Sequence, residues 1–272
     1  MPAAFILSVS ISVVLVLVGF ALGMVAEGLL PGAPRAAVRS TLPNTFYAVA
    51  YTLIQATIVP VFATGALLIV RGLGGGFITL PDDGAMLLVS AIVVLLAFDL
   101  AEYGFHRLQH AWRPLWLLHA LHHSDHDMNV TTTSRHCWVE LFIKALFLYP
   151  LVGLVFRVGP HATLIYFVLT YYNFVPHSNV KWSLGRFWMV LNSPQYHRIH
   201  HSREPRHHNR NFAALLPLYD VLFGTYHRPG EAEYPRTGLP EVAVPPGLVE
   251  MLTWPFAARR AAGSGAARAR GR

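Results

Sequence analysis

The sequence contains a single cysteine, Cys137, and few charged residues, which make up 13% of its 272 positions. One thiol excludes an internal disulfide and an iron–sulfur cluster held by four thiolates. Soluble domains are about one quarter charged. The low charge, the 54% hydrophobic content and a mean hydropathy of +0.42 therefore indicate a membrane protein. Any metal site must be built from histidine.

Several sequence signatures are missing as well. The glycine-rich segment at 72–84 is not followed by Gly-Lys-Ser/Thr, so it predicts a hydrated turn rather than a phosphate-binding loop. Neither an HExxH zinc motif nor a haem, flavin or iron–sulfur motif occurs. No Lys or Arg precedes Arg35, which favours a transmembrane helix over a secretory signal peptide near the N-terminus.

Five long apolar runs are spaced along the first two thirds of the chain. They predict an all-α polytopic membrane protein with about 4–5 transmembrane helices, located at 5–26, 46–70, 85–105, 138–156 and 161–176. The last segment is shorter than a typical span of about 20 residues. A proline-containing loop is expected at 31–43. We expect N-terminal membrane helices at 1–84, a catalytic domain at 85–228 and a C-terminal segment at 229–272.

Histidine is confined to one part of the chain, since fourteen of the fifteen lie between His106 and His208 and none precedes His106. On a helix, residues three and four positions apart share a face, so each cluster should project its rings together. Neutral imidazoles are good donors for first-row transition metals. The clusters HRLQH, HALHH and HRIHH supply more donors than one ion needs: His106, His110, His119, His122, His123, His197, His200 and His201.

The predicted hairpin at 138–176 returns the chain to the side it left, which allows the second and third clusters to meet at one site. Loops on the cytoplasmic side are enriched in Lys and Arg. Of the 21 such residues, this topology places only Arg71 and Arg157 on the far side, so the histidines and the C-terminus should be cytoplasmic. The basic tail at 257–272 is expected to be disordered against anionic lipid. The net charge of +7 therefore gives no indication of nucleic-acid binding.

At about residues 99–226 the chain resembles the membrane-bound fatty acid hydroxylase and sterol desaturase superfamily. The likeness rests on an ordered set of residues rather than on one cluster. They are Asp99, Tyr103, His106, Arg107 and His110; His119, His122, His123 and Ser124; Arg135 and Glu140; Asn173, His177 and Asn179; Pro194 before HRIHH; Asn211; and YDVLFGT at 219–225.

The resemblance implies a helical membrane fold with a cytoplasmic histidine-rich cap that holds two iron ions. It also implies O2-dependent hydroxylation or desaturation of a lipid. The eight clustered histidines would be metal ligands, and His177 would be the ninth. Because no redox cofactor motif is visible, electrons would come from an external donor of the ferredoxin or cytochrome type.

One departure from the family pattern concerns the segment after the second cluster. Many members have R-x-H-P-x-E there, whereas this chain has Arg135, His136, Cys137, Trp138, Val139 and Glu140. Cys137 therefore stands where histidine is common. Either the metal environment differs at this point, or His136 substitutes from the adjacent position, although a shift of one residue changes the face of a helix.

Acidic residues near the clusters are candidates for supporting roles. Asp99 and Glu102 precede His106 closely, and we expect them to accept an imidazole N–H or to pair with Arg107 or Arg135. Asp220 is expected to support the site or to cap the adjacent turn.

The remaining histidines are expected not to bind the metal pair. We place His126, His207 and His208 at the surface or behind the ligands, His161 on the opposite side, and His227 beyond the last motif.

The favoured function is O2-dependent removal of hydrogen from an unactivated lipid C–H bond, giving an alcohol or an alkene. A zinc-dependent membrane hydrolase and a metal transporter or sensor are the alternatives. Ionisable residues at mid-membrane would favour transport, and only Lys144 and Arg157, near the ends of crossings, approach that description. The sequence leaves open the lipid, the carbon attacked, the electron donor and the oligomeric state.

Overall fold

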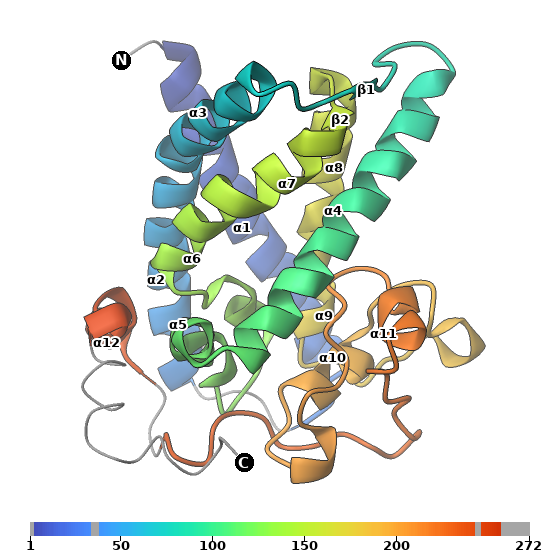
Figure 1. Cartoon of the computed structure of the whole chain (residues 1–272). Coiled ribbons are helices and arrows are strands. Elements are labelled where there is room, and N and C mark those ends of the chain that lie inside the picture. Colours follow the sequence, from blue (N-terminus) through green and yellow to red (C-terminus); the bar gives the residue numbers. More distant parts are fainter. Residues whose placement is uncertain (1–2, 34–37, 243–245, 257–272) are drawn as a thin grey trace.

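The computed structural model describes residues 3–33, 38–242 and 246–256. A bundle of long apolar helices occupies one end of the molecule, and short helices and loops form a cap at the other end (Figure 1). The bundle contains α1 (Ala3–Leu29), α2 (Val38–Thr57), α3 (Val59–Gly72), α4 (Met86–Ala111), α6 (Trp138–Ile143), α7 (Tyr149–Val155) and α8 (Pro160–Thr170). The cap contains α5 (Arg113–His123), α9 (Phe174–His177), α10 (Pro194–His200), α11 (Leu218–Leu222) and α12 (Leu248–Leu252).

Within the described residues, four helical segments are long and apolar enough to cross a membrane: Phe5–Leu29, Ser40–Gly72, Met86–Ala111 and Trp138–Val155. Their backbone groups are satisfied within the helices, as a lipid environment requires. The bundle ends, away from the cap, in a short parallel pairing of β1 (Ile78–Thr79) with β2 (Phe156–Arg157) (Figure 1). The predicted all-α membrane fold is confirmed.

Two boundaries differ from the predicted ones, and one predicted segment cannot be compared. The expected loop at 31–43 was wrong beyond position 37, because α2 begins at Val38 and includes Pro43. Contacts of Ser40 and Asn44 with the cap hold this first turn in place. Helix α4 continues past 105 to Ala111, so the first histidine cluster is the end of a spanning helix. The basic tail expected at 257–272 lies outside the described residues.

The hairpin between the second and third clusters is asymmetric. Its outward arm joins α6 and α7 through a π-helical turn, Lys144–Leu148, just before Pro150. Proline lacks an N–H and collides with the carbonyl four residues earlier, and a wider turn relieves that collision. The returning arm, α8, has only 11 residues, too few to span by itself. A 3-10 turn and α9 complete the return and place His177 beside His122.

A buried polar network that contains Asp125 and Arg135 joins α2 to the segment after the second cluster. Asp125 accepts hydrogen bonds from Ser40, Asn44 and Thr132, while Arg135 donates to Asn44 Oδ1 at 2.7 Å. Both charged side chains are at most 2% exposed. Burial raises the pKa of Asp125, but Arg135 and the hydrogen bonds outweigh this and hold it below its usual value. The cap is thereby fixed to the bundle.

The C-terminal strap, residues 227–239, lies along α10. Gln195 Nε2 donates to the carbonyls of Gly230 and Glu233 at 2.8 and 2.9 Å. Arg198 donates to the carbonyl of Pro235 and lies 4.0 Å above the ring of Tyr234. The strap therefore covers the outer side of the helix that carries the third histidine cluster.

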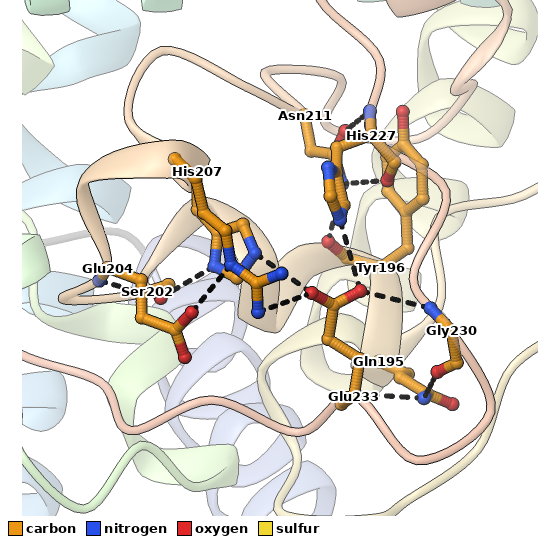
Figure 2. A network of polar contacts seen from close by, with 10 residues as sticks. Gln195, Tyr196, Ser202, Glu204, His207, Asn211, His227, Gly230 and Glu233 are labelled. Atoms are coloured by element: carbon orange, nitrogen blue, oxygen red, sulfur yellow. Dashed lines mark hydrogen bonds and ion pairs between the residues drawn. The ribbon is translucent and has the colours of Figure 1, made fainter.

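Glu233 anchors this strap (Figure 2). One carboxylate oxygen contacts His207 Nε2 and Arg206 Nη2, and the other contacts His227 Nε2 and the Gly230 N–H, each at 3.0 Å. Desolvation raises the pKa of Glu233, but the hydrogen bonds from Gly230, His227 and His207 lower it to about 2. The strap is thus held by a carboxylate that is charged at neutral pH.

We predict that Asp125→Ala lowers the stability of the protein by about 3–5 kcal/mol, because it removes the buried negative charge that offsets the buried Arg135 and leaves the donors of Ser40, Asn44 and Thr132 without their acceptor. Thermal unfolding in detergent, followed by tryptophan fluorescence, measures the loss. Asp127→Ala removes an exposed carboxylate two residues away and is the matched control. Equal transitions for the two variants would contradict this account of the buried network.

We also predict that Glu233→Gln lowers stability by about 1–3 kcal/mol at pH 7, since it weakens several charge-assisted hydrogen bonds at once. A pKa held near 2 means that the carboxylate stabilises the fold above its ordinary value of 4.5. The difference from wild type should shrink as pH falls from 4.5 towards 2. Thermal shifts across this range test it, with exposed Glu231→Gln as the control.

Candidate metal centre

The three histidine clusters and His177 meet in the cap, although they come from four different helices. The first cluster lies at the end of α4, the second on α5 and the third on α10 and its C-cap, while His177 ends α9. Their donor atoms form two groups, each within 4.8 Å: His106, His110, His119, His123 and His200; and His122, His177, His197 and His201. The structure brings together all nine histidines singled out from the sequence.

The grouping follows helical spacing of four rather than three. His119 and His123 enter the group of five, whereas His122 enters the group of four. In the third cluster, His197 and His201 stay together and His200 joins the other group. Successive helix positions differ by about 100°, so adjacent rings such as His122 and His123 diverge. Each of these two clusters therefore serves both groups.

Unpartnered nitrogens show that the rings suit a metal. The Nε2 atoms of His110, His123 and His200 are buried and have no hydrogen-bond partner among the described residues. In the group of four, Nε2 of His177 lies 3.2 Å from Nε2 of His122 and 3.0 Å from Nε2 of His197. A polar atom buried without a partner is costly, and a bound cation would satisfy each converging lone pair.

Backbone carbonyls set the orientation of three rings. The Nδ1 atoms of His106, His177 and His200 lie 2.7–2.9 Å from the carbonyls of Phe212, Asn173 and Arg210. A carbonyl can only accept, so Nδ1 carries the proton and the lone pair of each neutral ring is on Nε2. Such outer partners fix the tautomer of a metal ligand.

Burial keeps at least five of the converging histidines neutral. Desolvation lowers the pKa of His177 and His200 to about 3, despite the carbonyl that each ring contacts. It also lowers the pKa of His122, His123 and His201 well below the usual value, and neighbouring rings add to this effect. Neutral imidazoles can coordinate transition metals at physiological pH without first losing a proton.

The loop after the third cluster presents two of these carbonyls. Asn209 and Asn211 have φ values of 59° and 56°, in the left-handed region that asparagine tolerates better than most residues. Asp220 then accepts the N–H groups of Phe212 and Ala213, each at 2.8 Å. Asp220 therefore supports His106 indirectly, through the peptide whose carbonyl contacts that ring.

The other predicted acids have different partners from those expected. Asp99 contacts no imidazole and instead accepts the N–H groups of Leu215 and Leu216. Glu102 pairs with Lys144 at 2.8 Å. The expected pairing with Arg107 or Arg135 was wrong for both acids, because these carboxylates join the cap loop and the hairpin to α4.

Glu140 is the carboxylate that lies beside the second cluster. Its Oε2 atom is 3.6 Å from His119 Nδ1 and 3.5 Å from His136 Nδ1, and it accepts a hydrogen bond from Gln109 at 2.7 Å. The sequence signal for Glu140 was its position at the end of the motif that follows the second cluster. The ring of His136 stacks on His122 at 4.0 Å, behind the group of four.

Cys137 and Asn192 also lie close to the converging histidines. Cys137 is fully buried against Tyr47, Leu121 and Met251, so it is part of an apolar cluster and belongs to neither histidine group. Asn192, which the sequence did not single out, lies 3.3 Å from His197 Nδ1 and donates to the carbonyl of Ala213.

Three of the remaining histidines contact carboxylates away from the two groups. His207 and His227 converge on Glu233, but their contacting nitrogens already have that carboxylate as partner, unlike the unpartnered nitrogens of the group of five. His161 lies in the first turn of α8, at the end of the bundle away from the cap, and contacts Asp82.

Comparison with known proteins gives an independent result. Residues 91–225 match the fatty acid hydroxylase family model. Alkylglycerol monooxygenase of Danio rerio is 34% identical over 55% of this chain and 32% of its own length. Ornithine lipid hydroxylase OlsE of Rhizobium tropici is 32% identical over 65% of this chain and 53% of its own length.

The chain thus spans only about a third to a half of these two relatives. No solved structure matches. The family match begins within α4 and ends just after α11, so it encloses all nine converging histidines. With both a domain match and the lipid-oxygenating relatives, the chain belongs to the fatty acid hydroxylase superfamily.

Proposed function

We propose that the chain is a membrane-bound oxygenase that uses two iron ions and O2 to hydroxylate or desaturate a lipid C–H bond. The observation that carries the proposal is the division of nine histidines, seven of them buried and two half-buried, into adjacent groups of five and four. Contact between the groups is direct, since the rings of His123 and His201 stack at 4.4 Å. Two neighbouring nitrogen-lined sites suit a pair of ions better than one.

In this proposal, each group holds one ion. Imidazole donors suit iron among the first-row metals, and the bound pair would supply oxygen activation. The protein would contribute orientation and exclusion of water. The carbonyls of Phe212, Arg210 and Asn173 hold three rings in one tautomer, and Glu140 is placed to orient His119. Burial of the rings keeps bulk water from the reacting atoms.

The substrate that we infer is a membrane lipid with a polar head group. Support comes from the two relatives, whose names specify an alkylglycerol and an ornithine lipid. The location of the centre also supports it, because the first cluster ends the spanning helix α4, where a lipid can approach from the bilayer. Which carbon reacts would depend on how the chain of the lipid is held.

Electrons would come from a separate ferredoxin or cytochrome-type donor, and the cap would face the cytoplasm. Cationic side chains exposed on the cap fit both inferences: Lys181, Arg186, Arg206, Arg210, Arg228 and Arg236. Lys and Arg mark the cytoplasmic side of membrane proteins, and a basic face attracts an acidic partner.

Iron content tests the division into two groups. We expect about two iron ions per wild-type chain and about one in both His200→Ala and His122→Ala, since each substitution damages a different group. Inductively coupled plasma mass spectrometry measures the stoichiometry. His161→Ala, at the far end of the bundle, should retain both ions. Full iron content in both cap variants would contradict the assignment.

Product formation tests the reaction itself. Lipids from cells that express the chain should include a species heavier by one oxygen atom or lighter by two hydrogen atoms, detected by mass spectrometry. The species should be absent without O2 and in His200→Ala. Lipid cleavage without O2 would instead support a hydrolase, and metal flux without lipid turnover would support a transporter.

A further inference from the structure

An apolar lobe projects from the cap beside α4. It consists of residues 182–191 and of α11 with the residues that follow it up to 226. The strap does not cover its exposed surface. Its two segments are joined by stacking of Trp188 on Tyr226 at 5.6 Å and, at their base, by a hydrogen bond from the Asn192 N–H to the carbonyl of Leu215. Six of its Phe, Met, Val and Leu side chains remain 42–64% exposed: Phe187, Met189, Val190, Leu218, Leu222 and Phe223.

The lobe is attached to α4 well inside its spanning segment. Tyr219 donates its hydroxyl to the carbonyl of Leu96 at 2.9 Å, and Tyr103 stacks on Phe223 at 5.3 Å. Helix α4 has 26 residues and is therefore about 39 Å long, whereas the hydrocarbon core is about 30 Å thick. Leu96 and Tyr103 lie about 15 and 26 Å along this helix from Met86, so both contacts fall within a length of helix that the hydrocarbon core, about 30 Å thick, can contain.

Its surface is also continuous with the lipid-facing side of α4. A groove of about 380 Å³ is lined by Leu100 and Leu108 of α4 and by Phe223 of the lobe. These side chains are 43%, 47% and 52% exposed. Exposed leucines on a spanning helix face acyl chains. Phe223 therefore belongs to the same surface as the lipid-facing side of α4, which indicates that lipid covers it.

Two cations border the apolar side chains. The guanidinium of Arg107, which also lines the groove, lies 5.8 Å from the centre of the Tyr103 ring. That of Arg186 lies 4.7 Å from the centre of the Phe187 ring. The Phe187 ring is exposed beside its arginine, an arrangement that suits the membrane interface, where rings contact acyl chains and cations meet lipid phosphates.

We propose that this lobe is inserted into the leaflet on the side of the histidine centre. Its six exposed apolar side chains contact acyl chains, and Arg107 and Arg186 lie at the depth of the phosphates. The occupant of the surface is bilayer lipid. Large apolar patches that are exposed to water are rare in soluble surfaces, and insertion removes this one from water. The inference does not depend on the metal or on the reaction.

Depth-dependent fluorescence quenching tests the insertion. Single cysteines at Leu222 and Met189 are introduced with Cys137→Ala, labelled with a small fluorophore, and placed in nanodiscs of anionic phospholipid that carries a doxyl group at mid-chain. Leu88→Cys, on the exposed side of α4, is the control for lipid contact, and Glu231→Cys, on the strap, is the control for water.

Quenching at Leu222→Cys and Met189→Cys should exceed that at Glu231→Cys by about twofold or more and approach that at Leu88→Cys. Size-exclusion elution checks that each labelled variant is folded, and Val190→Cys replaces either one that is not. Quenching equal to that of Glu231→Cys would overturn the proposal, whether the patch faces water, a protein partner or a second copy of the chain.

Discussion

Nine imidazole rings packed against one another place a strict demand on the rest of the cap. A ring nitrogen that points inwards must present a lone pair, and the opposite nitrogen must then carry a proton and find an acceptor. The carbonyls of Phe212, Arg210 and Asn173 meet this demand for three rings. The cap loops are therefore shaped by where these acceptors must lie.

Buried carboxylates hold those loops in place. Asp220 accepts the N–H groups of Phe212 and Ala213, and Asp99 of α4 accepts those of Leu215 and Leu216. Asp125 and Arg135 join α2 to the segment after the second cluster. An ionised group in a dry environment is expensive unless it is fully hydrogen-bonded. In this protein Asp99 and Asp125 connect the cap to spanning helices, while the imidazoles remain directed towards one another.

The geometry of the centre is thus linked to the position of the bilayer. Helix α4 carries the first histidine cluster, the carboxylate that holds the 215–216 peptides, and the aromatic ring that receives the lobe. A lobe inserted in the leaflet would fix the height of this end of the cap relative to the lipid. An enzyme that reacts at one carbon of a long chain needs such a fixed height, because a displacement of a few ångströms selects a different carbon.

Apolar run length predicted the spanning helices, because a helix is the economical way to satisfy backbone groups in lipid. The residue set around the clusters predicted the histidines that converge and the family. Helix α2 was missed at its start, since its first turn depends on contacts with Asp125 from a distant segment. The roles of Asp99 and Glu102 were also beyond prediction, because sequence neighbours of His106 face different partners in three dimensions.

By itself, the sequence determined the chemistry that is available: neutral nitrogen donors in three helical clusters at the end of a membrane bundle. Only the tertiary structure decided how they divide. His122 and His123 are adjacent in sequence but belong to different groups, and His200 leaves the group that its neighbour His201 joins. Helical spacing fixes the direction of each ring on its own helix. Which rings meet depends on how α4, α5, α9 and α10 pack, and that is set by contacts between residues far apart in the chain.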